Sequence, residues 1–84
     1  MQNSKFHRTC ALKVYRHLES DNDLELKDIP PRMFEYLMNL SHVELVKPLV
    51  ILDLIAGKES GQVVRRYKIS AKVVRRIRRN AFVG

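Results

Sequence analysis

Apolar residues recur every three to four positions in several stretches of the chain, which is the spacing of one face of an α-helix. The first stretch runs from Ser4 to about Leu18 and the second from Pro31 to about Leu40. Two shorter stretches, one around Val63 to Tyr67 and one at residues 71–79, are each apolar on one side and basic on the other. The pattern predicts an all-α protein. The expected apolar face of the first helix consists of Phe6, Cys10, Ala11, Val14 and Leu18.

The middle of the chain allows two interpretations. Ser41 and Glu44 match a capping box, which favours one kinked helix beginning at His42. Pro48 opposes this, because a proline inside a helix loses a hydrogen bond and clashes with the preceding turn. We favour a short turn followed by a helix from Pro48 to Ala56, apolar almost all round.

Residues 24–29 alternate apolar and polar side chains, but the rest of the sequence shows no partner strand. We therefore expect an extended connector whose leucines pack on the helices. Pro31 suits the first position of the helix that follows. That helix is expected to bury Met33, Phe34, Leu37 and Leu40.

The last two helices are joined by about four residues, a pattern typical of a DNA-binding helix-turn-helix. Ser60 and Ser70 are suited to cap the first and second of them. Ile69 is expected to fill the angle between the helices. Lys68 stands where such turns most often have glycine, which takes the left-handed conformation readily. Gly57 suits the C′ position of the preceding helix.

Positive charge is concentrated in the same region. Residues 1–57 carry seven Lys and Arg against eight acids, a net charge of −1, whereas residues 58–84 carry nine against Glu59 alone, a net charge of +8. This asymmetry is expected when one face meets a polyanion. We predict a single small domain in which residues 1–43 form N-terminal helices for oligomerisation. Residues 44–84 then form a tri-helical helix-turn-helix unit.

The recognition helix is predicted at about residues 71–79, with five basic residues opposite its apolar arc. We expect Lys72 and Arg76 to contribute to base choice, with Arg75 as the next candidate. We expect contacts to the DNA phosphates mainly from Arg65, Arg66, Lys68, Arg78 and the region of Lys58. The predicted DNA-binding residues are Ser60, Arg65, Arg66, Lys68, Ser70, Ala71, Lys72, Arg75, Arg76, Arg78 and Arg79.

Other chemistry finds little support. A lone cysteine, Cys10, excludes an intramolecular disulfide, and together with His7 and His17 it lacks zinc-site spacing. The three glycines form no phosphate loop. We expect no catalysis, cofactor, metal or small-molecule ligand. The N-terminus resembles no secretory signal, and the longest apolar stretch is too short to cross a bilayer. The expected location is therefore the cytoplasm, in association with the nucleoid.

The segment Leu54-Ile55-Ala56-Gly57, followed by Gln62-Val63, Arg66-Tyr67 and Ile69-Ser70, resembles the adhesin-biosynthesis (P-pilus type) transcription regulators of enteric bacteria. Met33–Leu37 and Ser41 resemble the preceding apolar segment of that family more loosely. After Ser70 this chain is richer in arginine than the family. The resemblance implies a small regulator that binds operator DNA as an oligomer and controls surface-structure genes. A more general similarity links the chain to phage and plasmid helix-turn-helix regulators.

The predicted partner is double-stranded DNA, bound by a homodimer or a larger homo-oligomer. Its interface candidates are Phe6, Val14, Leu18, Phe34 and Leu37, unless these side chains complete one monomeric core. Two other functions stay open. One is RNA binding or non-specific nucleoid binding, against which stands the lack of an aromatic platform beside the basic run. The other is a protein- or membrane-interaction module built on a basic amphipathic helix.

Overall fold

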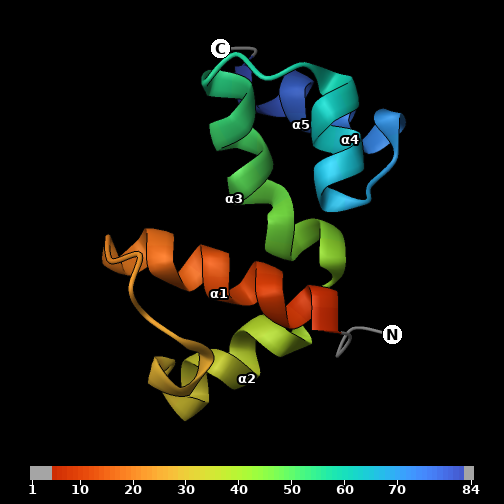
Figure 1. The fold of residues 1–84 in the computed structure, drawn as a ribbon. Coiled ribbons are helices and arrows are strands. Elements are labelled where there is room, and N and C mark those ends of the chain that lie inside the picture. The colour runs from red at the N-terminus through yellow and green to blue at the C-terminus, as the bar shows by residue number, and fades with distance from the viewer. Residues whose placement is uncertain (1–4, 83–84) are drawn as a thin grey trace. The chain divides into compact units, whose positions relative to one another are not determined.

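The computed structural model describes residues 5–82, and within that range the chain is helical without strands. This confirms the all-α prediction. No helix in the described range is long and apolar enough to cross a membrane. The elements follow one another along the chain as α1 (Lys5–Glu19), the 3-10 turn η1 (Leu26–Asp28), α2 (Pro31–Asn39), α3 (His42–Ile55), α4 (Ser60–Tyr67) and α5 (Ala71–Phe82) (Figure 1).

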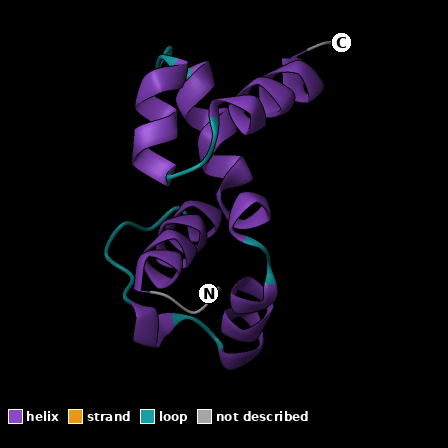
Figure 2. Cartoon of the chain, turned by 90° about the vertical axis from the view of Figure 1, so that its right-hand side faces the viewer, coloured by secondary structure: helices purple, strands orange, loops and turns teal. Residues whose placement is uncertain are grey.

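The helices belong to two compact units that divide between Val46 and Lys47, inside α3. The first unit holds α1, η1, α2 and the start of α3. The second holds the rest of α3 with α4 and α5, and the loops that join its helices are short (Figure 2). Each unit therefore contains helices enough to bury apolar side chains of its own.

In the first unit, α1 contributes most of the buried face that the sequence predicts. Cys10, Ala11 and Val14 are buried, as expected, and His7 and Tyr15 join them. The ring of Phe6 lies against that of His42, with centroids 5.4 Å apart. From the other elements of the unit, the buried side chains are Ile29, Leu37, Met38, Leu45 and Val46.

Leu18 departs from the prediction, because its side chain is 60% exposed. It lies in the last turn of α1, just before the chain turns away at Ser20, which has a positive φ of 55°. The Asp21 N–H donates to the Arg16 carbonyl at 3.1 Å, closing this left-handed helix end. The buried face of α1 therefore stops one turn before the helix does.

The predicted extended connector at residues 24–29 is also only partly right. Leu26 begins a 3-10 turn and is exposed, whereas Ile29 is buried. The Glu25 N–H donates to Asp28 Oδ2 at 2.8 Å, and the Asp28 N–H donates to the Glu25 carbonyl at 2.9 Å. These acids satisfy the local backbone, so the alternation of residue types does not mark an extended segment with packed leucines.

The helix predicted to start at Pro48 is wrong, and the single-helix interpretation holds. α3 begins at His42 and continues through Pro48. The Glu44 N–H donates to Ser41 Oγ at 3.2 Å and the Ser41 N–H to Glu44 Oε1 at 3.3 Å, so the predicted capping box is present. Buried apolar residues on both sides of the proline stabilise the continuous helix despite the missing hydrogen bond.

α3 ends as the sequence predicts. Gly57 is left-handed, with a φ of 89°. Its N–H donates to the Leu54 carbonyl at 3.1 Å, and the Lys58 N–H donates to the Asp53 carbonyl at 3.0 Å. This pair of bonds is a Schellman motif, which satisfies the last carbonyls of the helix and turns the chain toward α4.

Candidate nucleic-acid interface

Three residues, Lys68 to Ser70, join α4 to α5. Lys68 takes the left-handed conformation (φ 55°, ψ 47°) that its glycine-like position requires. Ile69 is buried, as predicted. The Val73 N–H donates to Ser70 Oγ at 3.2 Å, which confirms Ser70 as the cap of α5. The local chemistry of this turn was therefore readable from the sequence.

The start of α4 corrects the prediction that Ser60 caps it. Glu59 occupies the N-cap, and Ser60 is the first helical residue, half-buried. The Glu59 N–H donates to Gln62 Oε1 at 3.1 Å, as in a capping box. The spacing of Glu59 and Gln62 was the signal that could have identified this cap, because a side chain at the third helical position reaches back to the N-cap amide.

Apolar side chains hold α4 and α5 to the rest of the second unit. The Val63 and Val74 side chains are completely buried, and Ile77 nearly so. Tyr67 is only 4% exposed. Figure 2 shows α5 leaving the short loop after α4 and running toward the C-terminal end. This packing fixes which side of α5 faces inward and which faces outward.

The outward side of α5 is basic. At about 100° per residue, Lys72, Arg75, Arg76 and Arg79 lie opposite Val74 and Ile77. These four basic residues are exposed, as is Ala71 in the first turn. Arg78 is also exposed, but the same spacing puts it about 40° from Val74, at the edge of the buried side rather than opposite it. Ala81, in the last turn of α5, is also exposed.

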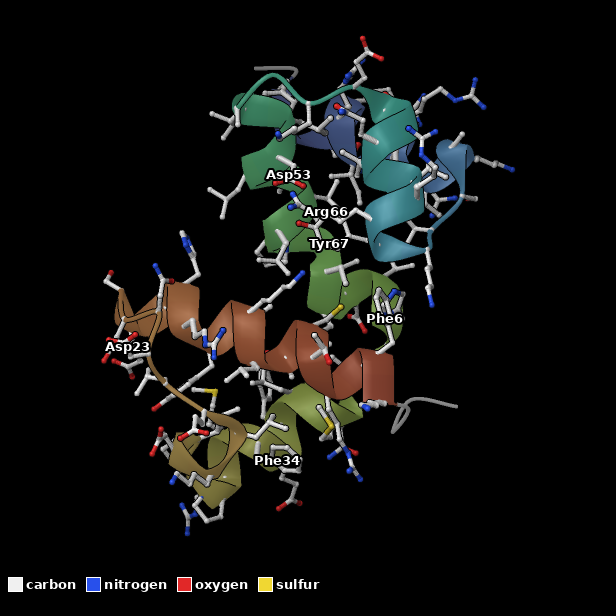
Figure 3. The ribbon with its side chains drawn as sticks, in the orientation of Figure 1. Phe6, Asp23, Phe34, Asp53, Arg66 and Tyr67 are labelled. Carbon is white, nitrogen blue, oxygen red and sulfur yellow. The ribbon has the colours of Figure 1, made fainter. Side chains whose placement is uncertain are left out.

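The two arginines of α4 have different surroundings. Arg65 is exposed, about 100° around the helix from Arg66. Arg66 Nη1 lies 3.0 Å from Asp53 Oδ2, in an ion pair between α4 and α3 (Figure 3). The Tyr67 hydroxyl donates to the same carboxylate oxygen at 3.0 Å. One acid of α3 thus binds two neighbouring side chains of α4.

This arrangement changes the acid–base properties of both donors. Burial raises the pKa of Tyr67 to about 12, and the hydrogen bond to Asp53 acts in the same direction. The hydrogen bond to Asp53 also raises the pKa of Arg66. Asp53, Lys58, Gln62 and Arg66 line a small open hollow of about 190 Å³ beside the ion pair.

The surroundings of Arg66 differ from those predicted, and its two neighbours in the structure, Asp53 and Tyr67, were not predicted to bind it or each other. Arg66 was assigned to phosphates, but in the structure its guanidinium binds Asp53. Asp53 is the only acid in the second half of α3, and helical spacing alone does not show which cation it meets. The pattern of residues assigned no partner to the Tyr67 hydroxyl. A partner could be assigned only once the approach of α4 to α3 was known.

No three His, Cys, Asp or Glu side chains among residues 5–82 lie close enough to hold a metal ion. Comparison with protein-family models, with curated proteins and with solved structures finds no match for this chain. The resemblance to the adhesin-biosynthesis regulators stays a prediction.

Proposed function

We propose that the protein is a transcriptional regulator that binds double-stranded DNA, with α5 as the recognition helix. The observation that carries the proposal is the two-sided surface of α5. Val74 and Ile77 anchor it to its own unit, and its four opposed cations face outward. A helix presented in this way, after a capped three-residue turn, suits insertion into the major groove.

Electrostatics support the same function. Residues 47–84 carry ten Lys and Arg against Asp53 and Glu59, a net charge of +8. Neutralising phosphates with such side chains releases counterions, which supplies much of the affinity for DNA. Lys72 and Arg76, with Arg75 next, are the proposed base-reading residues, because early positions of a recognition helix enter the groove deepest. Phosphate contact is proposed for Arg65, Lys68, Arg78 and Lys58.

Two observations disfavour the other functions considered. RNA and single-stranded binding usually employ exposed aromatic rings for stacking. Tyr67 is buried, which leaves Phe82, 48% exposed, as the accessible ring among the described residues of α4 and α5. A membrane-binding helix needs an available apolar side, but Val74 and Ile77 of α5 are already buried. Double-stranded DNA is the better partner for an outward side made of cations.

Selection of binding sites from a pool of random duplexes, followed by salt titration, tests this proposal. We expect one enriched sequence, bound at least about a thousandfold more tightly than a scrambled duplex. Equal affinity for every duplex would indicate non-specific nucleoid binding instead. Preference for single-stranded RNA over any duplex, or flotation with anionic vesicles in the absence of DNA, would contradict the proposal.

We also propose that the regulator is a homodimer or a larger homo-oligomer, since one recognition helix reads only a few base pairs. Val14 and Leu37, two interface candidates, are buried and are therefore unsuitable. Leu18 remains, and Phe34 lines an open hollow of about 270 Å³ with residues of α1 and α2. Light scattering of the intact protein at micromolar concentration, compared with a Leu18→Glu variant, tests this. A monomer that binds one isolated half-site without cooperativity would contradict it.

A further inference from the structure

Asp53 is the acceptor that separates Arg66 from the other cations of the basic surface. The Asp53 side chain is only 17% exposed, while that of Arg66 is 51% exposed. Oδ2 receives the Arg66 guanidinium and the Tyr67 hydroxyl, each at 3.0 Å. In addition, the Asp53 backbone carbonyl accepts the N–H of Lys58 at 3.0 Å. The Asp53 backbone thus belongs to the closed end of α3, and its carboxylate is shared by two donors from α4.

This geometry alters what Arg66 can offer a phosphate. A phosphate approaching the guanidinium also approaches the Asp53 carboxylate, and the two negative groups repel each other. If Arg66 instead left Asp53 to reach a phosphate, a largely buried carboxylate would lose a charged donor and keep the Tyr67 hydroxyl. Arg65, about 100° around α4 and exposed, faces neither difficulty.

We propose that Asp53 withholds Arg66 from the DNA backbone, so that Arg66 and Tyr67 position α4 on α3 while Arg65 makes the phosphate contact. This rests on the proposed DNA binding. In this arrangement Asp53 lowers the affinity of the protein for any duplex by removing one cation from the interface. Arg66 is then a positioning residue, and its effect on DNA passes through the placement of α4.

The test compares charge-neutralising variants on one fixed duplex and measures the slope of log binding constant against log salt concentration. Arg65→Gln is expected to make the slope shallower by about one, because one phosphate contact is lost. Arg66→Gln, its neighbour and matched control, should leave the slope unchanged. It should shift the urea unfolding equilibrium about fivefold toward the unfolded state, the size of a partly buried ion pair.

The decisive variant is Asp53→Asn, whose amide oxygen can still accept from Tyr67. It should release Arg66 and steepen the slope by about one, and this gain should disappear in the Asp53→Asn, Arg66→Gln double variant. Glu59→Gln removes the same charge from a residue that no ion pair joins to Arg66. Any tighter binding that Glu59→Gln causes should persist when Arg66 is also changed.

Two results would overturn the inference while leaving DNA binding intact. One is a slope that falls as much in Arg66→Gln as in Arg65→Gln. The other is a gain in Asp53→Asn that does not depend on Arg66. If the intact protein fails to bind any duplex, the proposed function fails, and the withholding of Arg66 fails with it.

Discussion

The imidazole Nε2 of His7 lies 3.4 Å from the carbonyl oxygen of Leu37, joining α1 to α2. A carbonyl oxygen can only accept, so Nε2 carries the hydrogen in this contact. The His7 side chain is 1% exposed, among the largest buried groups of the chain. A polar residue therefore occupies a core position where apolar periodicity would place an aliphatic side chain.

Replacing His7 by alanine is expected to destabilise the protein by about 2–3 kcal/mol, because it leaves a cavity and removes the donor to Leu37. His17→Ala, on the exposed side of the same helix, should change the free energy of unfolding by less than about 0.5 kcal/mol. Urea denaturation of both variants measures the difference. Equal effects would show that His7 is not a core residue.

Pro48→Ala should stabilise the protein by about 1–3 kcal/mol. Alanine restores an N–H donor in the middle of α3 and removes the clash of the proline ring with the preceding turn. Pro31→Ala is the matched control, because Pro31 begins α2 and its missing N–H has no partner to lose. Thermal unfolding of the two variants measures the difference, and only Pro48→Ala should raise the melting temperature. A Pro48→Ala variant that is no more stable than the parent protein would show that α3 accommodates the proline without a cost in stability.

Tyr67→Phe should destabilise the protein by about 1 kcal/mol at neutral pH, through loss of the hydrogen bond to Asp53. The folded pKa of Tyr67 is raised to about 12 from an ordinary 10. The protonated hydroxyl therefore stabilises the fold fully below pH 10, and this contribution is lost as pH rises from 10 to 12. The stability difference between parent and variant should shrink over that window. A constant difference up to pH 12 would contradict the assignment.

Alanine substitution of Lys72 or Arg76 should weaken binding to the selected duplex by about 1–3 kcal/mol and relax sequence preference at one position. Arg78→Ala, at the edge of the buried side of α5, should weaken all duplexes alike. Repeating site selection with each variant makes the comparison. If the Lys72 and Arg76 variants weaken every sequence equally, neither residue reads bases.

Local signals in the sequence predicted the local features of the fold. Ser70, Gly57 and the Ser41–Glu44 pair were assigned correctly, because a cap or a helix end depends on residues within one turn of the chain. Helical spacing predicted the buried Cys10, Ala11 and Val14 of α1, but not the buried His7 and Tyr15 beside them or the exposure of Leu18 in the last turn.

Features that depend on balance or on distant neighbours were not predictable in the same way. Pro48 destabilises α3 by removing a backbone hydrogen bond, whereas the buried side chains on both sides of it stabilise the helix. Only the packed structure shows that the burial outweighs the lost bond. The Arg66–Asp53 pair joins residues thirteen positions apart. Their meeting requires α4 to return along α3, which the charge pattern of α4 alone cannot reveal.

Lys68 links the shape of the turn to its charge. A lysine in the left-handed conformation costs about 1–2 kcal/mol relative to a glycine there, whereas its ammonium group adds a cation beside α5, the proposed recognition helix. Lys68→Gly would relax the backbone and remove that charge in the same step. At position 68, a residue that stabilises the turn between α4 and α5 therefore weakens the attraction for a polyanion, and a residue that strengthens this attraction destabilises the turn.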